Sequence, residues 1–470
     1  MPISNWNLIL LPRTAIRNVV RVPHFGLSLI RLPSILSALR IKRLSSVAAA
    51  ILLAGVRLFA TERSVIDHLL QLARTQPASE AFKAELIAVM GQEKISKGTA
   101  IAGNGPDFVW AVESGDAPVL YVNDEKYAPM QRVSGSLWFH TGKLATGNAH
   151  KFHYVVNGAI VGGSLNIPAY TPDSYAQPGV PQGKLSEKTV HVSKKIYPGM
   201  ETNYWVYLPA QYDPATPAAL MIWQDGERLG GRNNEEVCIL CPGLVRIQEV
   251  TDNLLFQKKI PVMVHLFIQA GTLNGRSMRS IEYDSVNDKY PRFLIEELLP
   301  EVYAKYNIRR DGYSHAIQGQ SSGGICAFNA GWHFPDQFSR IATQHGTFTA
   351  VAFRNHEPEA AHVYPTWVRR EPRKNLRVWV SDGSEDYENE WGSWPTQNLQ
   401  LANSLKFRGY DFRYYLGNGD HNAAIWAAKL PEAMIWLWRD YDPAKTGQVF
   451  NQDPEEQKKP FFRIKSLNRQ

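Results

Sequence analysis

The first 61 residues contain no acidic residue, although the chain of 470 residues has 44 Asp and Glu residues against 51 Lys and Arg residues. Eight of the basic residues lie in this acid-free stretch, so the rest of the chain has a net charge of about −1, compared with +7 for the whole. Nucleic-acid binding needs basic residues clustered on the folded part of a protein. The sequence therefore indicates no nucleic-acid partner.

Residues 1–61 also lack an apolar run long enough to span a membrane. Its apolar run at 44–55 follows Lys42 and Arg43 and is shorter than the roughly 20 residues that a spanning helix needs. A basic stretch before a short apolar run is typical of a targeting signal. We expect 1–61 to be a leader and the protein to be exported to the periplasm or secreted, with no stable membrane span in the mature body. A transit peptide, a downstream start, a retained anchor and a cytosolic protein are the alternatives.

Cysteine is scarce, with three residues in the chain. Cys238 and Cys241 have the spacing of a redox or half-zinc motif, but a second ligand pair and a thioredoxin-like pattern are missing. We favour a local disulfide or two idle thiols over a metal or redox site, and we expect no metal. Cys326 is expected to be a small buried residue on a helix.

Hydrophobic periodicity divides the chain after the leader into parts. Residues 62–99 have apolar side chains at helical spacing, interrupted at Pro77, and predict a helical segment. Residues 100–170 consist of short alternating segments with a strong hairpin turn at Asn157-Gly158, and predict a small β-sandwich. A linker rich in proline and glycine is expected at 171–185.

Residues 186–445 alternate between strand and helix patterns, which predicts an α/β domain with helices on both faces of a sheet. The expected strands are 205–208, 219–223, 262–268, 315–318 and 377–380, with a shorter one at 414–415. The expected helices are 292–306, 325–331, 398–408 and 431–438. Residues 446–470 are expected to be a loose tail.

The most informative motif is Gly319-Gln320-Ser321-Ser322-Gly323, between the strand at 315–318 and the helix at 325–331. A serine nucleophile on a sharp strand–helix turn needs glycine two positions before and after it, because side chains there would collide with the turn. Ser321 has both glycines, whereas Ser322 has Gln320 at the earlier position. We predict that Ser321 is the nucleophile, and a structural glycine-rich turn is the alternative.

Such a serine requires a histidine base, and in this arrangement the acid and then the histidine follow it in the chain. His421 lies just after the strand at 414–415, near the end of the α/β part, and is the candidate base. His345 follows the elbow helix too closely to be the usual base and is expected to line the pocket. His356 and His362 are expected to be surface or structural residues.

The acid should follow the preceding strand, at 377–380. Asp386 lies in the next loop with a Gly-x-x-Asp spacing that is common at this place, and it is the candidate acid. Three other acidic residues of the loop are alternatives: Asp382, Glu385 and Glu388.

Acyl transfer also needs backbone N–H groups to stabilise an oxyanion. We expect one from Ser322, at the start of the helix after the elbow, and one from Gly226, in the loop after the strand at 219–223. Glu227 of that loop is the alternative second donor and a candidate substrate contact.

Three further side chains are candidate substrate contacts. Trp391 and Trp394 are expected to stack against a sugar or an aromatic acid, with buried packing as an equal alternative. Arg279 is expected to form an ion pair with Glu282, and binding of an anionic substrate is its alternative role.

Several of these stretches resemble the putative-esterase family that includes enterochelin esterases, esterase D and feruloyl esterases. They are Gln224-Asp225-Gly226, Glu282-Tyr283-Asp284 with Phe293, Glu296-Glu297-Leu298-Leu299-Pro300, the elbow, and His421 with Trp426. The β-rich part resembles the early-set, immunoglobulin-like sandwich of enterochelin esterases at Phe108-Val109-Trp110, Pro129-Met130, Leu137-Trp138 and Asn157-Gly158. The resemblance covers about residues 107–441. It implies an α/β-hydrolase fold and a serine carboxylester hydrolase (EC 3.1.1.-) that needs no cofactor, with Ser321, Asp386 and His421 as its triad.

The expected function is two-step acyl transfer to water through an acyl-enzyme. The expected partner is a small-molecule or glycan ester: an acylated carbohydrate, a feruloyl-type ester or a siderophore-type ester. An acyltransferase with the same triad is the first alternative, and a peptidase is a weaker one. A non-catalytic carbohydrate-binding protein with a decayed hydrolase fold would have lost the nucleophile, base or acid, whereas all three have candidates here. The sequence indicates no oligomeric state.

Overall fold

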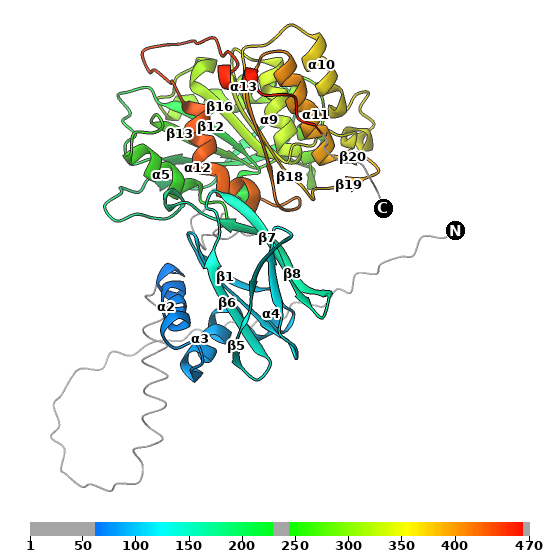
Figure 1. Ribbon diagram of the computed structural model, residues 1–470. Coiled ribbons are helices and arrows are strands. Elements are labelled where there is room, and N and C mark those ends of the chain that lie inside the picture. Colours follow the sequence, from blue (N-terminus) through cyan, green and yellow to red (C-terminus); the bar gives the residue numbers. More distant parts are fainter. Residues whose placement is uncertain (1–61, 229–243, 464–470) are drawn as a thin grey trace, which may run out of the picture. The chain divides into compact units, whose positions relative to one another are not determined.

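Residues 62–228 and 244–463 are described by the structure, which is a computed structural model (Figure 1). The leader expected at 1–61, the Cys238 and Cys241 pair and the last seven residues of the expected tail lie outside the described residues. In the described part of the chain, no helix is both long and apolar enough to cross a membrane.

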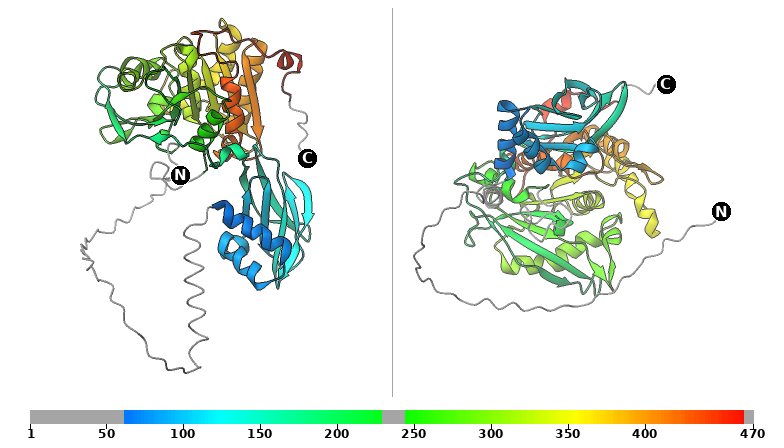
Figure 2. Two further views of the ribbon diagram at one scale, coloured as in Figure 1. Left: turned by 90° about the vertical axis from the view of Figure 1, so that its left-hand side faces the viewer. Right: turned by 90° about the horizontal axis from the view of Figure 1, so that it is seen from below.

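Three helices precede the first strand: α2 (Glu62–Thr75), α3 (Glu80–Met90) and α4 (Gln92–Ser96). The break between α2 and α3 contains Pro77, and α3 begins where the Ser79 side chain accepts a hydrogen bond from the Phe82 N–H at 3.0 Å. Buried side chains of these helices, such as Leu69 and Leu86, pack against Val109 and Ala111 of the following sheet. The helices thereby cover one face of that sheet (Figure 2).

Two four-stranded antiparallel sheets follow, with the orders β1-β2-β6-β5 and β4-β3-β7-β8. Along β2, Val109 and Ala111 face the helices, whereas Phe108 and Trp110 face the second sheet and pack with Leu120. This alternation is the period of two of a β-strand between two layers. The expected sandwich is confirmed. Its strands are β1 (Ala100–Asn104), β2 (Asp107–Glu113), β3 (Val119–Val122), β4 (Glu125–Pro129), β5 (Gln131–Ser134), β6 (Leu137–Lys143), β7 (Asn148–Val156) and β8 (Ala159–Ala169).

The α/β part is built on a larger mixed sheet with the order β15-β14-β11-β13-β12-β16-β17-β18-β21, in which β9 and β10 also pair with β11. Six neighbouring strands of this sheet, β13, β12, β16, β17, β18 and β21, are parallel, and β16 lies between β12 and β17. The strands are β9 (Lys184–Leu185), β10 (Thr189–Val192), β11 (Glu201–Leu208), β12 (Ala219–Gln224), β13 (Met263–Ile268), β14 (Thr272–Leu273), β15 (Arg276–Ser277), β16 (His315–Gln320), β17 (Arg340–Gln344), β18 (Arg377–Gly383) and β21 (Asp411–Gly417). A short pair, β19 (Glu388–Asn389) and β20 (Gly392–Ser393), follows β18.

Helices cover both faces of this sheet (Figures 1 and 2). Met221 and Trp223 of β12 pack with α5 (Ile247–Phe256) and α12 (Ala424–Trp438). Leu220 and Ile222 of the same strand pack with the helices of the opposite face. The prediction of an α/β-hydrolase sheet is confirmed. The other helices are α6 (Arg279–Tyr283), α7 (Lys289–Phe293), α8 (Leu299–Lys305), α9 (Ser322–His333), α10 (Tyr364–Arg370), α11 (Trp394–Phe407) and α13 (Pro454–Lys458).

The helix expected at 292–306 is interrupted. A π-helical stretch, Leu294–Leu298, separates α7 from α8. Pro300, in the first turn of α8, has no N–H to donate to the carbonyl of Glu296, and its ring crowds that carbonyl. Widening the preceding turn relieves this conflict.

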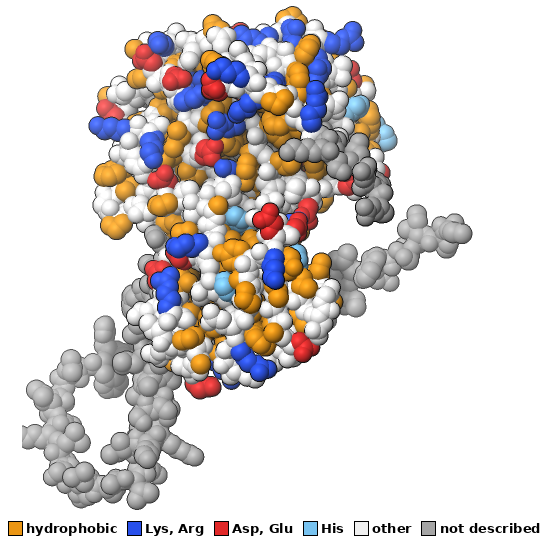
Figure 3. Space-filling view, in the orientation of Figure 1, with side chains coloured by type: hydrophobic (Ala, Val, Ile, Leu, Met, Phe, Trp, Pro, Cys, Tyr) orange, Lys and Arg blue, Asp and Glu red, His pale blue; other side chains and the backbone are white. Residues whose placement is uncertain are grey.

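Charged side chains of both signs are mixed on the face drawn in Figure 3, with hydrophobic ones scattered among them. This distribution fits the near-neutral charge of the chain after residue 61.

Candidate active site

Ser321 lies at the junction between β16 and α9 with φ 60° and ψ −124°. A positive φ is strained for a residue with a Cβ atom, and it raises the serine out of the sheet. A Cβ on Gly319 would lie 2.1 Å from the carbonyl oxygen of Gly323, so only glycine fits there. A Cβ on Gly323 would approach Asp225 Oδ2 to 3.2 Å. The two glycines thus have the steric role that the motif requires.

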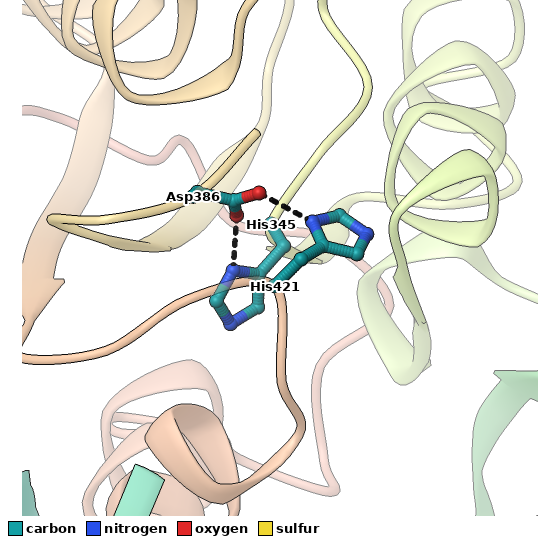
Figure 4. A group of neighbouring side chains, drawn as sticks. All are labelled: His345, Asp386 and His421. Carbon is teal, nitrogen blue, oxygen red and sulfur yellow. Dashed lines mark hydrogen bonds and ion pairs between the residues drawn. The ribbon is translucent and has the colours of Figure 1, made fainter. Parts of the chain in front are cut away.

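The candidate acid and base meet at the same edge of the sheet. Asp386 lies in the turn after β18, and His421 lies in the loop between β21 and α12. His421 Nδ1 is 2.6 Å from Asp386 Oδ1 (Figure 4). The carboxyl ends of the parallel strands β16, β18 and β21 bring Ser321, Asp386 and His421 to one edge of the sheet. With Nδ1 bound to the carboxylate, Nε2 is the nitrogen of His421 available for proton transfer.

The carboxylate of Asp386 is held by several donors. Its Oδ1 also accepts a hydrogen bond from the Tyr387 N–H at 2.6 Å, and its Oδ2 lies 2.6 Å from His345 Nδ1. Burial alone would raise the pKa of Asp386, but the hydrogen bonds from His345 and His421 outweigh burial and hold this pKa well below its usual range. Asp386 is therefore an ionised, fixed acceptor.

Aromatic rings enclose His421. The Tyr387 ring stacks on the imidazole with centroids 4.3 Å apart, and Trp394 approaches it edge-on at 6.0 Å. The indole N–H of Trp394 donates to Thr347 Oγ1 at 3.3 Å, and Thr347 Oγ1 lies 3.3 Å from Ser321 Oγ. These contacts connect the surroundings of the base to those of the nucleophile.

His345 lies behind Asp386 and is fully buried, rather than among the residues that line the cavity. Its Nδ1 is 3.2 Å from Asp382 Oδ1 as well as 2.6 Å from Asp386 Oδ2, and its Nε2 has no hydrogen-bond partner among the described residues. Burial lowers the pKa of His345, but the hydrogen bonds with Asp382 and Asp386 outweigh it and raise this pKa to about 9. Burial raises the pKa of Asp382 to about 7. Protonated His345 thus lies against two acidic side chains.

Replacing His345 with glutamine should flatten the pH dependence of folding stability. The pKa of about 9 in the folded protein exceeds the ordinary value of 6.5. Protonation therefore stabilises the folded state fully below about pH 6.5, and this contribution, about 3 kcal/mol, is lost as the pH rises through 9. We expect the free energy of unfolding, measured by denaturant titration, to fall over this window in the native protein and to fall less in His345→Gln. Parallel curves would refute a charged His345.

The cluster of His345, Asp386 and His421 also has the composition of a metal site, since one ligand atom from each lies within 4.8 Å of the others. A metal would need neutral imidazoles with free ring nitrogens. Both Nδ1 atoms instead point at the carboxylate, and the pKa of His345 is raised rather than lowered. We interpret the cluster as a hydrogen-bonded relay.

Of the two expected oxyanion donors, Ser322 directly follows Ser321, and Gly226 lies just after β12, the strand next to β16 in the sheet. Ser322 is the first residue of α9, where backbone N–H groups have no partner within the helix. Gly226 directly follows Asp225 after β12, and a Cβ on it would lie 2.4 Å from the backbone nitrogen of Ile268. Glu227, the next residue of this short helical turn, is not among the residues that line the cavity.

Arg279 fixes the loop that contains Gly226. Its guanidinium donates to both carboxylate oxygens of Asp225, at 2.6 and 2.8 Å. The predicted pairing with Glu282 is wrong, because the buried carboxylate of Glu282 instead accepts the Gly271 N–H at 2.6 Å. A bidentate pair is geometrically specific, so Arg279 helps to define the path of this loop.

A cavity of about 220 Å³ lies beside Ser321. Trp391 and Trp394 both line it, but Trp391 is half-buried, whereas Trp394 is 4% exposed. Arg279 and Arg354 also line it, the first paired with Asp225 and the second 3.8 Å from Asp284. A larger cavity, of about 570 Å³, is formed by residues such as Ala219 and Val262 at the opposite edge of the sheet, away from Ser321.

Sequence reasoning missed five residues that line this cavity: Thr347, Val351, Arg354, Tyr387 and Asn389. Thr347 follows β17, a strand that the sequence analysis did not predict, so nothing marked its proximity to Ser321. Tyr387 is next to the candidate acid, and that position was a usable signal for a contact with the base.

A family model and two curated proteins match parts of the chain. A model of the family described as putative esterase matches residues 196–437. The iron(III) enterobactin esterase of Dickeya dadantii is 26% identical over 193 residues, which cover 39% of this chain and 42% of that protein. The protein of the same name from Escherichia coli is 24% identical over 252 residues, which cover 48% and 58%. The chain thus spans about half the length of the curated relatives it matches.

A crystal structure of an enterobactin esterase from Shigella flexneri, solved in the presence of enterobactin, was also matched. The match covers 77% of this chain and 99% of that chain, with 15% sequence identity and a TM-score of 0.48.

Proposed function

The chain belongs to the putative esterase family, and from this premise we propose that it hydrolyses carboxylic esters through an acyl-enzyme on Ser321. The observation that carries the proposal is the arrangement of Ser321 on a strained elbow at the sheet edge where His421 binds Asp386 at 2.6 Å. A decayed, purely binding protein has no need to retain this arrangement.

In the first step, His421 Nε2 takes the proton of Ser321 as Oγ attacks the ester carbonyl. The amides of Ser322 and Gly226 stabilise the oxyanion. The C–O bond to the alcohol then breaks, and His421 returns the proton to the leaving oxygen. In the second step, His421 deprotonates a water molecule that attacks the acyl group; the bond to Ser321 Oγ then breaks, His421 returns the proton to Oγ, and the acid is released. Asp386 keeps Nε2 of His421 free to accept each proton.

The cavity beside Ser321 favours an aromatic acyl group. Tyr387, Trp391 and Trp394 supply aromatic surface, and Arg354 lies with its guanidinium 6.0 Å from the centroid of the Trp391 ring. Such a wall attracts an aryl group by stacking, and the arginine favours a ring that has negative charge. We place feruloyl-type and siderophore-type esters ahead of acylated carbohydrate. Siderophore-type esters fit the names of the curated relatives, which are enterobactin esterases.

The test is a comparison of p-nitrophenyl acetate with a feruloyl ester on the full chain and on Trp391→Ala. We expect the native protein to hydrolyse both esters, with no loss in a metal chelator. Loss of the indole should lower kcat/KM for the feruloyl ester by about 2- to 13-fold, the value of one aromatic contact, and leave the acetyl ester nearly unchanged.

The acetyl ester is the internal control, because its acyl group has no ring that could stack on the aromatic side chains. Equal losses for both esters would contradict the role of Trp391 in substrate selection. A native protein that hydrolyses neither ester would contradict the proposed activity. Formation of a new ester when an alcohol is added would favour the acyltransferase, which uses the same triad.

A further inference from the structure

The β-sandwich contacts both loops that contribute the acid and the base. Asn166 of β8 and Asp420, the neighbour of His421, form two hydrogen bonds. Asn166 Oδ1 accepts the Asp420 N–H at 3.0 Å, and Asn166 Nδ2 donates to Asp420 Oδ1 at 2.7 Å. On β7, Lys151 forms an ion pair with Glu385, the neighbour of Asp386. Residues separated by more than 230 positions thus meet beside the triad.

The backbone of the His421 loop is fitted to Asn166. Gly419 has φ 152°, and a Cβ there would lie 2.3 Å from Asn166 Oδ1, so the contact excludes a larger residue. Asn166 itself has φ 61°, in the left-handed region that asparagine tolerates better than most residues. Asn166 and Gly419 therefore both have backbone conformations outside ordinary strand geometry where the two segments meet.

The two triad loops are also bonded to each other. The Glu385 N–H donates to the Gly419 carbonyl at 2.8 Å, and the Ser384 N–H donates to the Gly417 carbonyl at 2.8 Å. A displacement of the loop around Gly419 would therefore disturb both the base and the acid. Asn166 contacts this joined unit at the residue next to His421.

We propose that Asn166 of the β-sandwich is a positioning residue that holds His421 in register with Asp386. The inference rests on the proposed function, since it concerns the same site. The sandwich then acts in catalysis without touching the substrate. Small displacements of a catalytic group can cost about 100-fold in rate, so a contact with the adjacent residue is sufficient for a large effect.

Asn148 provides a matched control. It lies at the start of β7, and its Oδ1 accepts a hydrogen bond from Tyr415 Oη of β21 at 3.2 Å. Asn148→Ala therefore removes a hydrogen bond between an asparagine of the same β-hairpin and the α/β part, but one that does not involve a triad loop.

The first experiment measures kcat, KM and the pH profile of ester hydrolysis in the full chain and both variants. We expect Asn166→Ala to lower kcat by 10- to 100-fold with KM changed less than threefold. The acidic limb of kcat/KM should move to lower pH, because a less well held carboxylate stabilises the imidazolium less. Asn148→Ala should change kcat by less than threefold and leave the pH profile in place. Equal effects of the two variants would overturn the proposal.

A swap of the two side chains tests the hydrogen bonds themselves. Asn166→Asp places a carboxylate against Asp420 and should reduce kcat as much as Asn166→Ala. Adding Asp420→Asn restores one donor and one acceptor across the pair, and should recover at least half of the lost activity on a logarithmic scale. A double variant no better than Asn166→Asp would overturn the proposal.

Hydrogen exchange separates this inference from the proposed activity. We expect faster exchange of the Asp420 amide in Asn166→Ala than in the native protein or Asn148→Ala, whether or not any ester is hydrolysed. Unchanged exchange of the Asp420 amide would refute the positioning role of Asn166 even in an active enzyme. A native protein that is inactive on esters but shows the exchange difference would refute the proposed function alone.

Discussion

Replacing Ser321 with alanine is expected to lower kcat for ester hydrolysis by about four to six orders of magnitude, or about 5 to 8 kcal/mol of activation free energy. The variant loses the nucleophile, so no acyl-enzyme can form, whereas the cavity and the amides of Ser322 and Gly226 remain. Folding should change little, because alanine meets the same strain at φ 60° and loses only a weak hydrogen bond, 3.3 Å long, to Thr347.

Ser322→Ala is the matched control for this variant. Ser322 is the adjacent serine, and its proposed contribution comes from its backbone N–H, which alanine keeps. We expect its kcat to remain within tenfold of the native value. Steady-state kinetics and a thermal unfolding scan of both variants check the prediction. Comparable losses in the two variants would contradict the assignment of the nucleophile.

Asp386→Asn is expected to lower kcat by about three to four orders of magnitude. The side-chain amide offers an N–H where one of the two imidazoles needs an acceptor. If that N–H faces His421, the imidazole must accept through Nδ1 and place its proton on Nε2, which then cannot take the proton of Ser321. The pKa of His345 should fall in the same variant, because one of its two acidic partners is lost.

Asp382→Asn distinguishes the role of Asp382 from that of Asp386. Asp382 Oδ1 lies 3.2 Å from His345 Nδ1, whereas Asp386 Oδ1 is hydrogen-bonded to His421 Nδ1 at 2.6 Å. We therefore expect Asp382→Asn to lower the pKa of His345 but to reduce kcat by less than tenfold. NMR titration of the histidine rings, together with kcat, reads both effects. A larger loss of kcat in Asp382→Asn than in Asp386→Asn would transfer the role of the acid to Asp382.

The elbow could be predicted from the sequence because its constraint is local. A Cβ on Gly319 would collide with the carbonyl of Gly323, four residues later, and such a local collision leaves a readable pattern, whereas the neighbours that restrict Gly323 are Gln224 and Asp225 of a distant segment. The order of serine, acid and histidine then limited the candidates to a few downstream residues. The strand after the elbow helix, β17, was missed because its ends are polar. Arg340 and Gln344 are both buried, and the Arg340 guanidinium packs over aromatic rings such as those of Tyr313 and Trp438.

The position of His345 could not be derived from the sequence for the same reason. Without β17, nothing indicated that His345 lies at the end of a strand beside β18 and faces Asp382 and Asp386. The contact between Asn166 and Asp420 spans 254 positions, and neither residue stands out in its own segment. Periodicity reveals elements and local turns, whereas contacts between distant segments depend on how the elements pack.

The central claim is that Ser321 forms a covalent acyl-enzyme with the help of His421. Its most direct test is reaction of the full chain with a fluorophosphonate ester, followed by peptide mapping in a mass spectrometer. The account predicts one adduct per chain, on Ser321, with loss of esterase activity in proportion to labelling and much slower labelling of His421→Ala. An adduct on another residue, or continued ester hydrolysis by fully labelled protein, would contradict it.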